Sequence, residues 1–411
     1  MIAVVRNLQP GDSKNPLTLS KVIAELRKRA ADAQLPGATL LIDREVVLDA
    51  DIDVPATIDL RFIGAGRIVR GESSATLRLA RTPRAGLWQV FGRPNEPETI
   101  PVVRFSTRCD PVYTDWWGGS GNNWTDWDNG ALRKNPTIDY WATAKGFQAA
   151  LDSVAPRGGV VRIAPGTYTL TQTLQVHSGT TLAGVDGNRV KLRWIRCDGI
   201  RIDRGAVDVE VSGFSMHWTP GPAGAAGGCT AIAMSSGRGV RIEGVTLQFD
   251  AGSANQFETG IHQQATAGGD TLDRMRDLRI LHCLPMARGR LVVLEAADDV
   301  RLEDVLHSRN IANGDRPAAI GLVVGCRTAD PCRDVRVLDG SFERLAVCVL
   351  VVNADGLRIE GNYFEVMYRN HHTTVFSKNN IQDYFDPPER RYIVVQAVPG
   401  DPDARALSGE G

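Results

Sequence analysis

Val240-Arg241-Ile242-Glu243-Gly244 is the stretch of sequence that decides the fold. Apolar and polar residues alternate through it, which is typical of a short β-strand with one buried face. The same order (apolar residue, Arg, apolar residue, any residue, small or turn-forming residue) recurs four more times, and a looser copy has Glu in place of Arg. The copies begin at Val209, Val240, Leu278, Val300, Val335 and Leu357.

The spacing of these copies indicates a solenoid. Successive copies begin 31, 38, 22, 35 and 22 residues apart, so the longer spacings are the shortest one with 9, 16 or 13 additional residues. The pattern lacks the Leu and Asn positions of a leucine-rich repeat, and an antiparallel sandwich would not repeat one strand motif in the same sense. We therefore predict an all-β fold, a right-handed parallel β-helix (solenoid), from about Trp141 to about Phe364. Its inward side chains are expected to form a buried ladder of Ile242, Ile280, Leu302, Val337 and Ile359.

A capping helix is predicted where the β-helix begins. Asp139 can cap its N-terminus, and its apolar residues share one face. These residues are Phe147, Ala150, Leu151 and Val154. Gly158-Gly159 ends the helix, and strand residues follow from Val160 to Tyr168. Such a helix would cover the open edge of the first coil, which would otherwise promote aggregation.

A similar order occurs nearer the N-terminus. An apolar helix face at Val22, Ile23, Leu26 and Ala30 precedes a break at Pro36-Gly37 and a strand segment from Thr39 to Leu48. We predict four parts for the chain. They are a smaller N-terminal α+β module at 1–108, a Trp- and Gly-rich segment leading into the β-helix at 109–140, the parallel β-helix at 141–365, and a closing or oligomerisation segment at 366–411.

Composition narrows the function classes. The sequence has a net charge of −1 and 23% charged residues, so it lacks the excess of basic residues that is typical of a nucleic-acid-binding protein. Seven irregularly spaced Cys favour reduced thiols over a disulfide framework, with a bridge between Cys326 and Cys332 as the alternative. The sequence contains no stretch of 18 apolar residues, so membrane insertion is not predicted. The first residues lack the pattern of a signal peptide, and we therefore expect the chain to fold in a cytoplasm.

Two stretches resemble a known family. The run from Val112 to Gly119, with its Trp116-Trp117 pair, resembles the segment before the β-helix in pectate-lyase-superfamily spike proteins of phages. The run from Phe147 to Tyr168 is similar to that family's capping helix and first coil. Where the family commonly has Gly-Asp-Gly and paired Asp, this chain has the run from Asn122 to Gly130.

The resemblance implies a virion spike. Family members include glycan-cleaving lyases and hydrolases, epimerases, and spikes that bind or degrade surface polysaccharide, so the fold does not settle the function. Spikes of the family are typically homotrimers with an N-terminal particle-attachment domain. The module at 1–108 would then contact other virion structural proteins.

The inserted residues predict a groove. Loops are expected near Met216–Gly228, Asp250–Asp270 and His307–Pro317, and equivalent corners of stacked coils would bring them to one flank. Candidate catalytic residues are the carboxylates Asp250, Glu258 and Asp315 and the possible general bases His262 and His307. Candidate substrate-binding residues in the groove are Trp218, Asn310 and Arg316. The alternative is that these are solvated loop residues.

Three further features each have two interpretations. An outward ladder of arginines could bind an anionic polysaccharide, or could be a salt-bridged surface or subunit contact with neighbouring Glu residues. It comprises Arg241, Arg279, Arg301, Arg336 and Arg358. The aromatic cluster from Tyr113 to Trp141 could stack on sugars, but packing on the first coil explains it better. Asp298-Asp299 resembles a catalytic pair, but a turn explains it better.

The sequence leaves three functions open. The first is a virion spike, on tail or head, that binds and possibly degrades host cell-surface polysaccharide. The second is a stand-alone polysaccharide lyase or glycoside hydrolase, and the third is an adhesive or structural β-helix without catalysis. The motif sets of polygalacturonases and extracellular pectate lyases are absent, so enzymatic activity stays uncertain, and no cofactor or metal is predicted.

Overall fold

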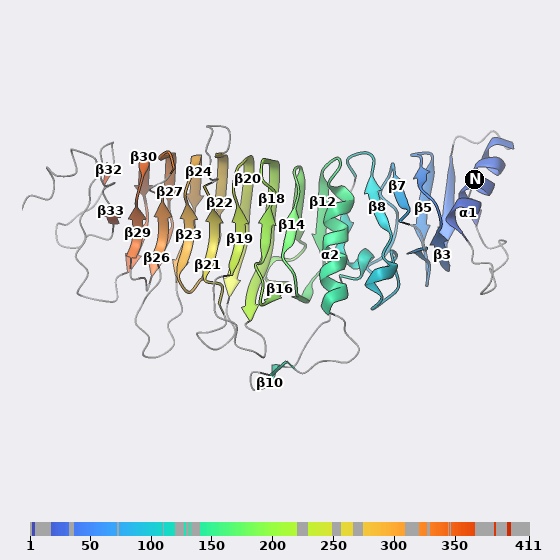
Figure 1. The fold of residues 1–411 in the computed structure, drawn as a ribbon, viewed down its shortest axis with the longest axis horizontal. Coiled ribbons are helices and arrows are strands. Elements are labelled where there is room, and N and C mark those ends of the chain that lie inside the picture. The colour runs from blue at the N-terminus through green and yellow to red at the C-terminus, as the bar shows by residue number, and fades with distance from the viewer. Residues whose placement is uncertain are drawn as a thin grey trace, which may run out of the picture. The chain divides into compact units, whose positions relative to one another are not determined.

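The computed structural model describes most of the chain as two compact units, residues 1–190 and residues 191–411. We call them the N-terminal unit and the C-terminal unit. The described residues are 2–4, 18–32, 37–71, 74–109, 111–119, 127–128, 131–132, 140–219, 229–248, 256–265, 274–308, 320–326, 329–343, 345, 347–365, 382–383 and 393–395. Both units consist mainly of β-strands paired in parallel, with two α-helices among the described residues (Figure 1).

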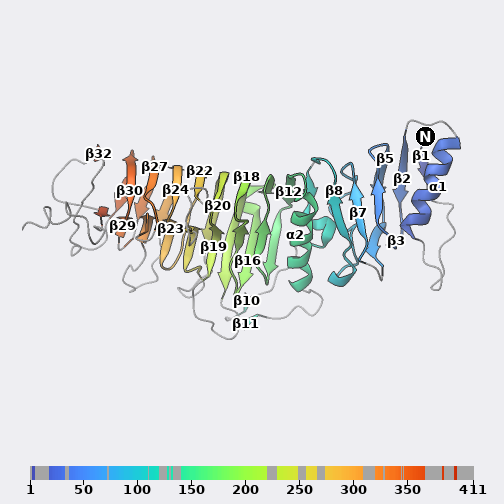
Figure 2. The ribbon, with the colours of Figure 1, turned by 45° about the horizontal axis from the view of Figure 1, so that its top comes forward.

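The N-terminal unit stacks parallel strands in three small sheets. They are β1 (Ile2–Val4), β2 (Ala38–Ile42) and β5 (Ile58–Phe62); β3 (Glu45–Leu48) and β6 (Arg67–Arg70); and β4 (Ile52–Val54), β7 (Thr76–Leu79) and β8 (Val102–Phe105). Figure 2 shows β7 and β8 side by side, as their pairing requires. Helix α1 (Leu19–Asp32) buries Val22, Ile23 and Leu26, which confirms these three residues of its predicted apolar face; the side chain of the fourth, Ala30, is not described.

The second helix, α2 (Tyr140–Val154), matches the predicted capping helix: Phe147, Ala150, Leu151 and Val154 are all fully buried. The predicted cap, Asp139, lies outside the described residues. The other elements of this part of the sequence are η2 (Pro97–Thr99), β9 (Val112–Tyr113), η3 (Thr114–Trp117), β10 (Trp127–Asp128), β11 (Ala131–Leu132), β12 (Gly159–Ile163), β13 (Gly166–Leu170), β14 (Leu174–Val176), β15 (Thr180–Gly184) and η4 (Gly187–Arg189).

The C-terminal unit contains the repeated motif. Its first sheet has β16 (Val190–Ile195), β18 (Ala206–Thr219), β20 (Gly237–Gln248), β22 (Met275–Leu281), β24 (Ala297–Glu303), β27 (Cys332–Leu338), β30 (Ala354–Glu360) and β32 (Gln382–Asp383). Its second sheet has β17 (Ile200–Ile202), β19 (Thr230–Met234), β21 (Thr259–Gln263), β23 (Arg290–Leu294), β26 (Ile320–Val324), β29 (Val347–Val351) and β33 (Ile393–Val395). Its third has β25 (Leu306–Ser308), β28 (Ser341–Glu343) and β31 (Tyr363–Glu365).

The predicted ladder is confirmed. Ile242 pairs with Ile280, and the column continues in register through Leu302, Val337 and Ile359. All five side chains are at most 5% exposed. Each buried aliphatic side chain contributes roughly 1.5–3 kcal/mol, so this column is a main source of stability.

Two rows of left-handed residues bracket this column. In each copy of the motif, the residue before the motif and the fifth residue of the motif have positive φ. The first row is Asp208, Gly239, Asp277, Asp299, Asp334 and Gly356, and the second is Gly213, Gly244, His282, Asp304, Asp339 and Gly361. Gly, Asp and Asn tolerate this conformation best, so the same two positions of each copy of the motif require residues of this kind.

Replacing Asp299 tests this explanation. Its φ is +52°, so Asp299→Val should lower the free energy of unfolding by about 1–2 kcal/mol, because a β-branched residue is strained in this region. Asp299→Gly should be close to neutral. Urea unfolding of both variants measures the difference, and equal stabilities would contradict the role of the left-handed row.

The aromatic segment before α2 packs inward. Trp116 and Trp117 are 3% and 0% exposed, and the Trp117 ring lies 4.8 Å from that of Phe91. A Cβ on Gly146 of α2 would come within 2.4 Å of the Trp117 carbonyl oxygen, so glycine permits this close approach. Packing rather than sugar stacking therefore explains the Trp pair.

Asp115 in the same segment is a buried carboxyl group. Its Oδ2 has no hydrogen-bond donor among the described residues, and burial raises its pKa to about 6. A carboxyl whose folded-state pKa is raised destabilises the fold when it ionises. Stability of the N-terminal unit should therefore fall as the pH rises from about 4 towards about 6 and stay lower above that.

We expect Asp115→Asn to remove this loss. At pH values below the ordinary pKa of Asp, the variant and the parent protein should be equally stable. At neutral pH the variant should be more stable, by up to about 3 kcal/mol, the free-energy equivalent of the shift. Thermal unfolding at both pH values measures this, with Asp53→Asn, whose side chain is 76% exposed, as the control. A variant less stable at neutral pH would contradict the assignment.

Three expectations need correction or completion. The predicted loop at 250–270 contains strand β21, because each coil has further strands beyond the repeated motif. The predicted loop from Met216 begins later, since Met216 is buried in β18. The seven cysteines, all of them described, form no disulfide, so Cys326 and Cys332 are not bridged. No described helix is long and apolar enough to cross a membrane.

Candidate functional site

The second sheet of the C-terminal unit presents an ionisable pair on its outer face. In β21, Ile261 and Gln263 are buried, and since side chains alternate along a strand, His262 between them points outward. The next coil places Glu295 directly after β23. His262 Nε2 and Glu295 Oε1 lie 3.0 Å apart, with side chains 15% and 24% exposed.

The electrostatics of this pair set the orientation of the imidazole. The hydrogen bond from His262 and one from the backbone N–H of Ala265 to Oε2 (2.8 Å) hold the pKa of Glu295 below its ordinary value, against the opposing effect of burial. An ionised carboxylate accepts only, so His262 donates from Nε2. Its Nδ1 has no hydrogen bond to any described residue. The arrangement is that of a general base oriented by a carboxylate.

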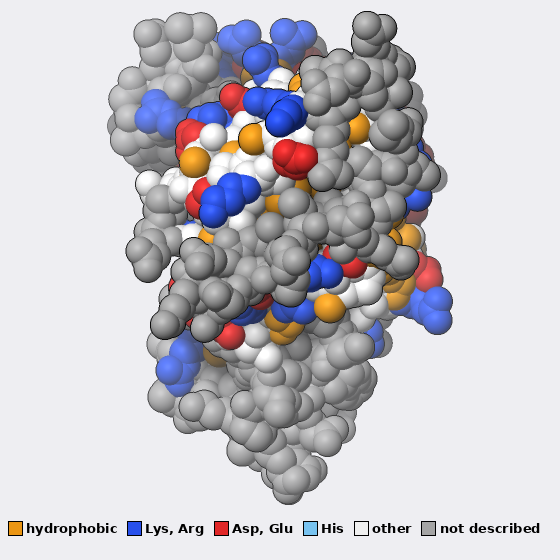
Figure 3. Space-filling view, turned by 90° about the vertical axis from the view of Figure 1, so that its right-hand side faces the viewer, with side chains coloured by type: hydrophobic (Ala, Val, Ile, Leu, Met, Phe, Trp, Pro, Cys, Tyr) orange, Lys and Arg blue, Asp and Glu red, His pale blue; other side chains and the backbone are white. Residues whose placement is uncertain are grey.

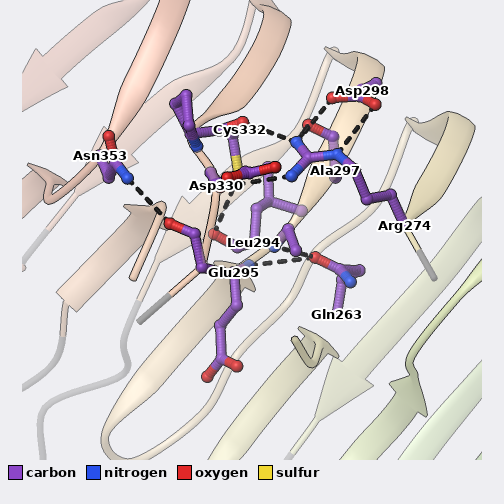
Figure 4. Close-up of polar contacts among 12 residues, drawn as sticks. Gln263, Arg274, Leu294, Glu295, Ala297, Asp298, Asp330, Cys332 and Asn353 are labelled. Carbon is purple, nitrogen blue, oxygen red and sulfur yellow. Dashed lines mark hydrogen bonds and ion pairs between the residues drawn. The ribbon is translucent and has the colours of Figure 1, made fainter. Parts of the chain in front are cut away.

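Gln263 holds the turn that carries Glu295. Its buried amide oxygen accepts the backbone N–H groups of Glu295 and Ala296, at 3.1 and 2.7 Å. Its amide nitrogen donates to the carbonyls of Ser235 and Gln264, at 2.7 and 3.0 Å. One side chain thus links residues beside β19, β21 and β23, three neighbouring strands of the second sheet. In Figure 4 the Glu295 side chain points away from the buried contacts around this turn.

Arg274 makes the other set of contacts in Figure 4. Its guanidinium, 6% exposed, binds both carboxylate oxygens of Asp298, at 2.9 and 2.6 Å. It also donates to the carbonyls of Pro331 (2.6 Å) and Asp330 (3.3 Å). Asp298 is therefore a structural partner, and Asp299 has a left-handed backbone, which explains this acidic pair without catalysis.

Glu258 stands at the other end of β21. A Cβ on Gly289 would come within 2.3 Å of Glu258 Oε1, so glycine makes room for this carboxylate. Four residues along a strand span about 13 Å, which separates the backbone of Glu258 from that of His262. The two candidates therefore occupy opposite ends of one strand and not one loop.

The remaining predicted residues are placed as follows. Asp250, Asn310, Asp315 and Arg316 lie outside the described residues. His307 lies in β25 and pairs with Phe342, and its side chain is not described. Trp218 is 2% exposed at the end of β18, so its prediction as a groove residue was wrong: the end of that strand is buried on both faces.

The arginine ladder is in register, as predicted, from Arg241 through Arg279, Arg301 and Arg336 to Arg358. Arg241, Arg301 and Arg358 pair with the Glu two residues along, at 2.7, 2.6 and 2.6 Å. Arg279 pairs with Asp277 at 2.7 Å. These pairs favour the salt-bridged surface over a polysaccharide contact.

Three segments outside the described residues precede strands that begin in one row. They are 220–228, 249–255 and 309–319, and they precede β19, β21 and β26, whose first residues are Thr230, Thr259 and Ile320. Thr230 is in register with Thr259, and both continue through Arg290 to Ile320. The last part of the predicted loop at 250–270 is instead followed by β22 of the first sheet, so the common flank stays a prediction. His262 lies about 10 Å along the strand from this row.

Sequence reasoning missed Glu295, Gln263 and Arg274. Their contacts join residues 24 to 57 positions apart, and a spacing of 22 does not pair them. The only signal available was polar residues beside the second, unrecognised set of strands. Among the described residues, no group of three His, Cys, Asp or Glu side chains could hold a metal ion.

Comparisons with known proteins found structural neighbours only. No protein-family model matches the sequence, and no curated protein sequence matches it. Similar solved structures include ORF18 of Geobacillus virus E2, with 14% identity and a TM-score of 0.35 over 62% of this chain and 52% of that one. This chain thus spans about half the length of that neighbour.

Two other neighbours cover more of the chain. The Streptococcus pneumoniae surface protein and adhesin PfbA has 11% identity and a TM-score of 0.34, over 89% of this chain and 97% of that one. The Siphovirus 9NA tailspike receptor binding domain has 11% identity and a TM-score of 0.18, over 92% of this chain and 79% of that one. The neighbours are thus phage proteins and a surface adhesin.

Proposed function

We propose that this chain is a virion spike or adhesin, a right-handed parallel β-helix of the pectate-lyase superfamily, that binds host cell-surface polysaccharide around His262 and Glu295 and cleaves it there. The observation that carries the proposal is the hydrogen-bonded pair on the outer face of β21 and β23, about 10 Å along the strand from the row where β19, β21 and β26 begin. The run of residues from Val112 to Gly119 supports the family assignment.

The chemistry at this pair suits removal of a proton from a sugar. A carboxylate-oriented imidazole with an available Nδ1 can act as general base, either on a carbon-bound proton in a lyase or on water in a hydrolase. The candidate acids of a hydrolase, Asp250 and Asp315, belong to the same proposal, with Glu258 at the far end of β21. Loop residues Asn310 and Arg316 are proposed as sugar contacts.

A panel of purified capsular and surface polysaccharides tests the function. We expect one polysaccharide to retain the full-length protein in a pull-down and to be shortened by it. New reducing ends without ultraviolet absorbance of unsaturated uronate indicate a hydrolase, and both signals together indicate a lyase. Retention without cleavage would support the purely adhesive alternative. If no polysaccharide is either retained or cleaved, the proposal is contradicted.

The oligomeric state separates a spike from a stand-alone enzyme. We propose a homotrimer with the module at 1–108 attached to other virion proteins, assembled in the host cytoplasm. Sedimentation equilibrium of the full chain should give three times the mass of one chain. A monomer that cleaves polysaccharide would favour the stand-alone lyase or hydrolase.

A further inference from the structure

The N-terminal unit contains a pocket of about 470 Å³ between the segments that follow β7 and β8. This volume lies in the range of small-molecule sites. One wall is formed by residues 80–85 and the other by residues 107–109 and Pro111, and Trp116 also lines the pocket. None of these residues belongs to the site around His262.

Hydrogen bonds fix both walls. Arg84 donates its backbone N–H to Leu60 and accepts one from Phe62, at 2.8 and 2.9 Å. Thr107 Oγ1 donates to the Ala80 carbonyl at 2.9 Å, which ties the second wall to the first. Trp116 Nε1 donates to the Gly86 carbonyl at 2.9 Å. A preformed pocket loses little conformational entropy on binding.

The pocket carries an excess of positive charge. Arg81, Arg84 and Arg108 line it, and Asp59 is the one carboxylate among its described lining residues. Arg84 Nε lies 3.3 Å from Asp59 Oδ2, while Arg81 donates to the neutral Ala56 carbonyl. Arg108 has no hydrogen bond or ion pair with any described residue. Two positive charges are thus unbalanced, although the whole chain has a net charge of −1.

This excess is local. In Figure 3, Lys and Arg side chains alternate with Asp and Glu over the described surface that faces the viewer, so that surface is not a single basic field. A guanidinium matches a carboxylate in shape and can bind it through two parallel hydrogen bonds. The pocket therefore suits a compact anion better than an extended polyanion such as nucleic acid.

An exposed aromatic residue follows the first wall closely in the sequence. Trp88 is 38% exposed, and it lies three residues after the wall residue Ala85. A Cβ on Gly86 would come within 1.9 Å of the Trp88 ring, so the ring lies against the backbone of Gly86. A ring held in this way offers an apolar face to the carbon-bound hydrogens of a sugar.

We propose that this pocket binds a carboxylate-bearing sugar, with Arg81 and Arg108 contacting the carboxylate and Trp88 packing on the sugar ring. The N-terminal unit would then recognise an acidic glycan independently of the site at His262. The inference extends the proposed polysaccharide recognition to a second site, and it does not require cleavage.

Calorimetric titration of the full chain tests the proposal with four probes. They are a short oligogalacturonate, a sialylated oligosaccharide, a neutral malto-oligosaccharide and inorganic phosphate. We expect saturable binding of at least one acidic saccharide, weakened by salt, and no binding of the neutral one. If neither of the two acidic saccharides binds, the proposal is overturned. Phosphate that binds as tightly as the acidic saccharide and displaces it would also overturn it, because the pocket would then be a general anion site.

Variants assign the binding to the pocket. Arg81→Gln and Arg108→Gln should each weaken binding at least about tenfold, the effect of losing one charged hydrogen bond. Trp88→Ala should weaken it several-fold. Arg238→Gln, an exposed arginine of the C-terminal unit, is the control and should leave it unchanged. Unchanged binding in the Arg81 and Arg108 variants would overturn the proposal, whereas polysaccharide cleavage at His262 should be unaffected by them, so the two sites fail separately.

Discussion

Replacing Arg274 with Ala is expected to lower the free energy of unfolding of the C-terminal unit by about 3–5 kcal/mol. The Arg274 side chain is 6% exposed, and its guanidinium donates hydrogen bonds to both carboxylate oxygens of Asp298. Its removal leaves a partly buried carboxylate without its counter-charge, and the carbonyls of Pro331 and Asp330 without their donor. Each unsatisfied buried group adds to the cost.

Thermal unfolding measures the effect. For a unit of this size, a loss of this order lowers the midpoint by roughly 10 °C. Arg238→Ala removes a side chain of the same kind from an exposed position on a neighbouring coil, and it should shift the midpoint little. Equal midpoints for Arg274→Ala and Arg238→Ala would contradict the structural role of Arg274.

A double variant separates the charge from the packing. Arg274→Met alone leaves Asp298 charged, whereas Arg274→Met with Asp298→Leu removes the whole pair. Replacement of a buried ion pair by apolar residues is often neutral or stabilising, so the double variant should recover much of the loss. A double variant as unstable as the single one would show that the backbone carbonyls at Asp330 and Pro331 dominate the energetics.

The contrast between the ladder and the Arg274 cluster explains what sequence could predict. The motif at Val240 has strict alternation and recurs at comparable positions, so the column through Ile242 followed from pattern alone. The strand β23 has no alternation, since Leu291, Val292, Val293 and Leu294 are all buried. In the sequence, a strand that is buried on both faces cannot be distinguished from another short apolar segment, such as part of a buried helix. The strands of the second sheet were therefore not predicted, and one of them, β21, lies in a predicted loop.

The candidate site was predictable only in part. The outward position of His262 follows from its strand, but a strand was not predicted there, and its partner Glu295 is 33 residues away. The turns between strands vary in length, so no fixed spacing links these two residues. Trp218 failed for the opposite reason: the alternation that begins β18 gives way to continuous burial at its end, which local pattern does not reveal.

The left-handed rows show a signal that was present and only half used. The turn-forming residue after each motif was part of the pattern, and His282 and Asp304 fit it as well as Gly244 does. The residue before each motif carries the same information, since it is Asp or Gly in every copy. Reading both positions would have fixed the ends of each rung, because few other residues tolerate positive φ.

His262→Gln is expected to reduce the rate of polysaccharide cleavage by about 10²–10⁴-fold, the usual contribution of a general base. Glutamine keeps a donor towards Glu295 but cannot take up a proton. Glu295→Gln should also reduce the rate, because the amide has one oxygen for the two N–H donors of His262 and Ala265. Its NH2 group can face Nε2 instead, which favours the imidazole tautomer that has a proton on Nδ1. The rate should be measured as new reducing ends on the polysaccharide that the panel identifies.

A matched control distinguishes a base from a merely structural histidine. His282→Asn is the matched control: His282 forms a similar pair with Asp304, at 3.0 Å, on the first sheet. It sits at φ +52°, which Asn tolerates, so the fold should be retained. If His262→Gln cleaves as fast as His282→Asn, while both remain folded, His262 is not the base and the catalytic part of the proposal fails.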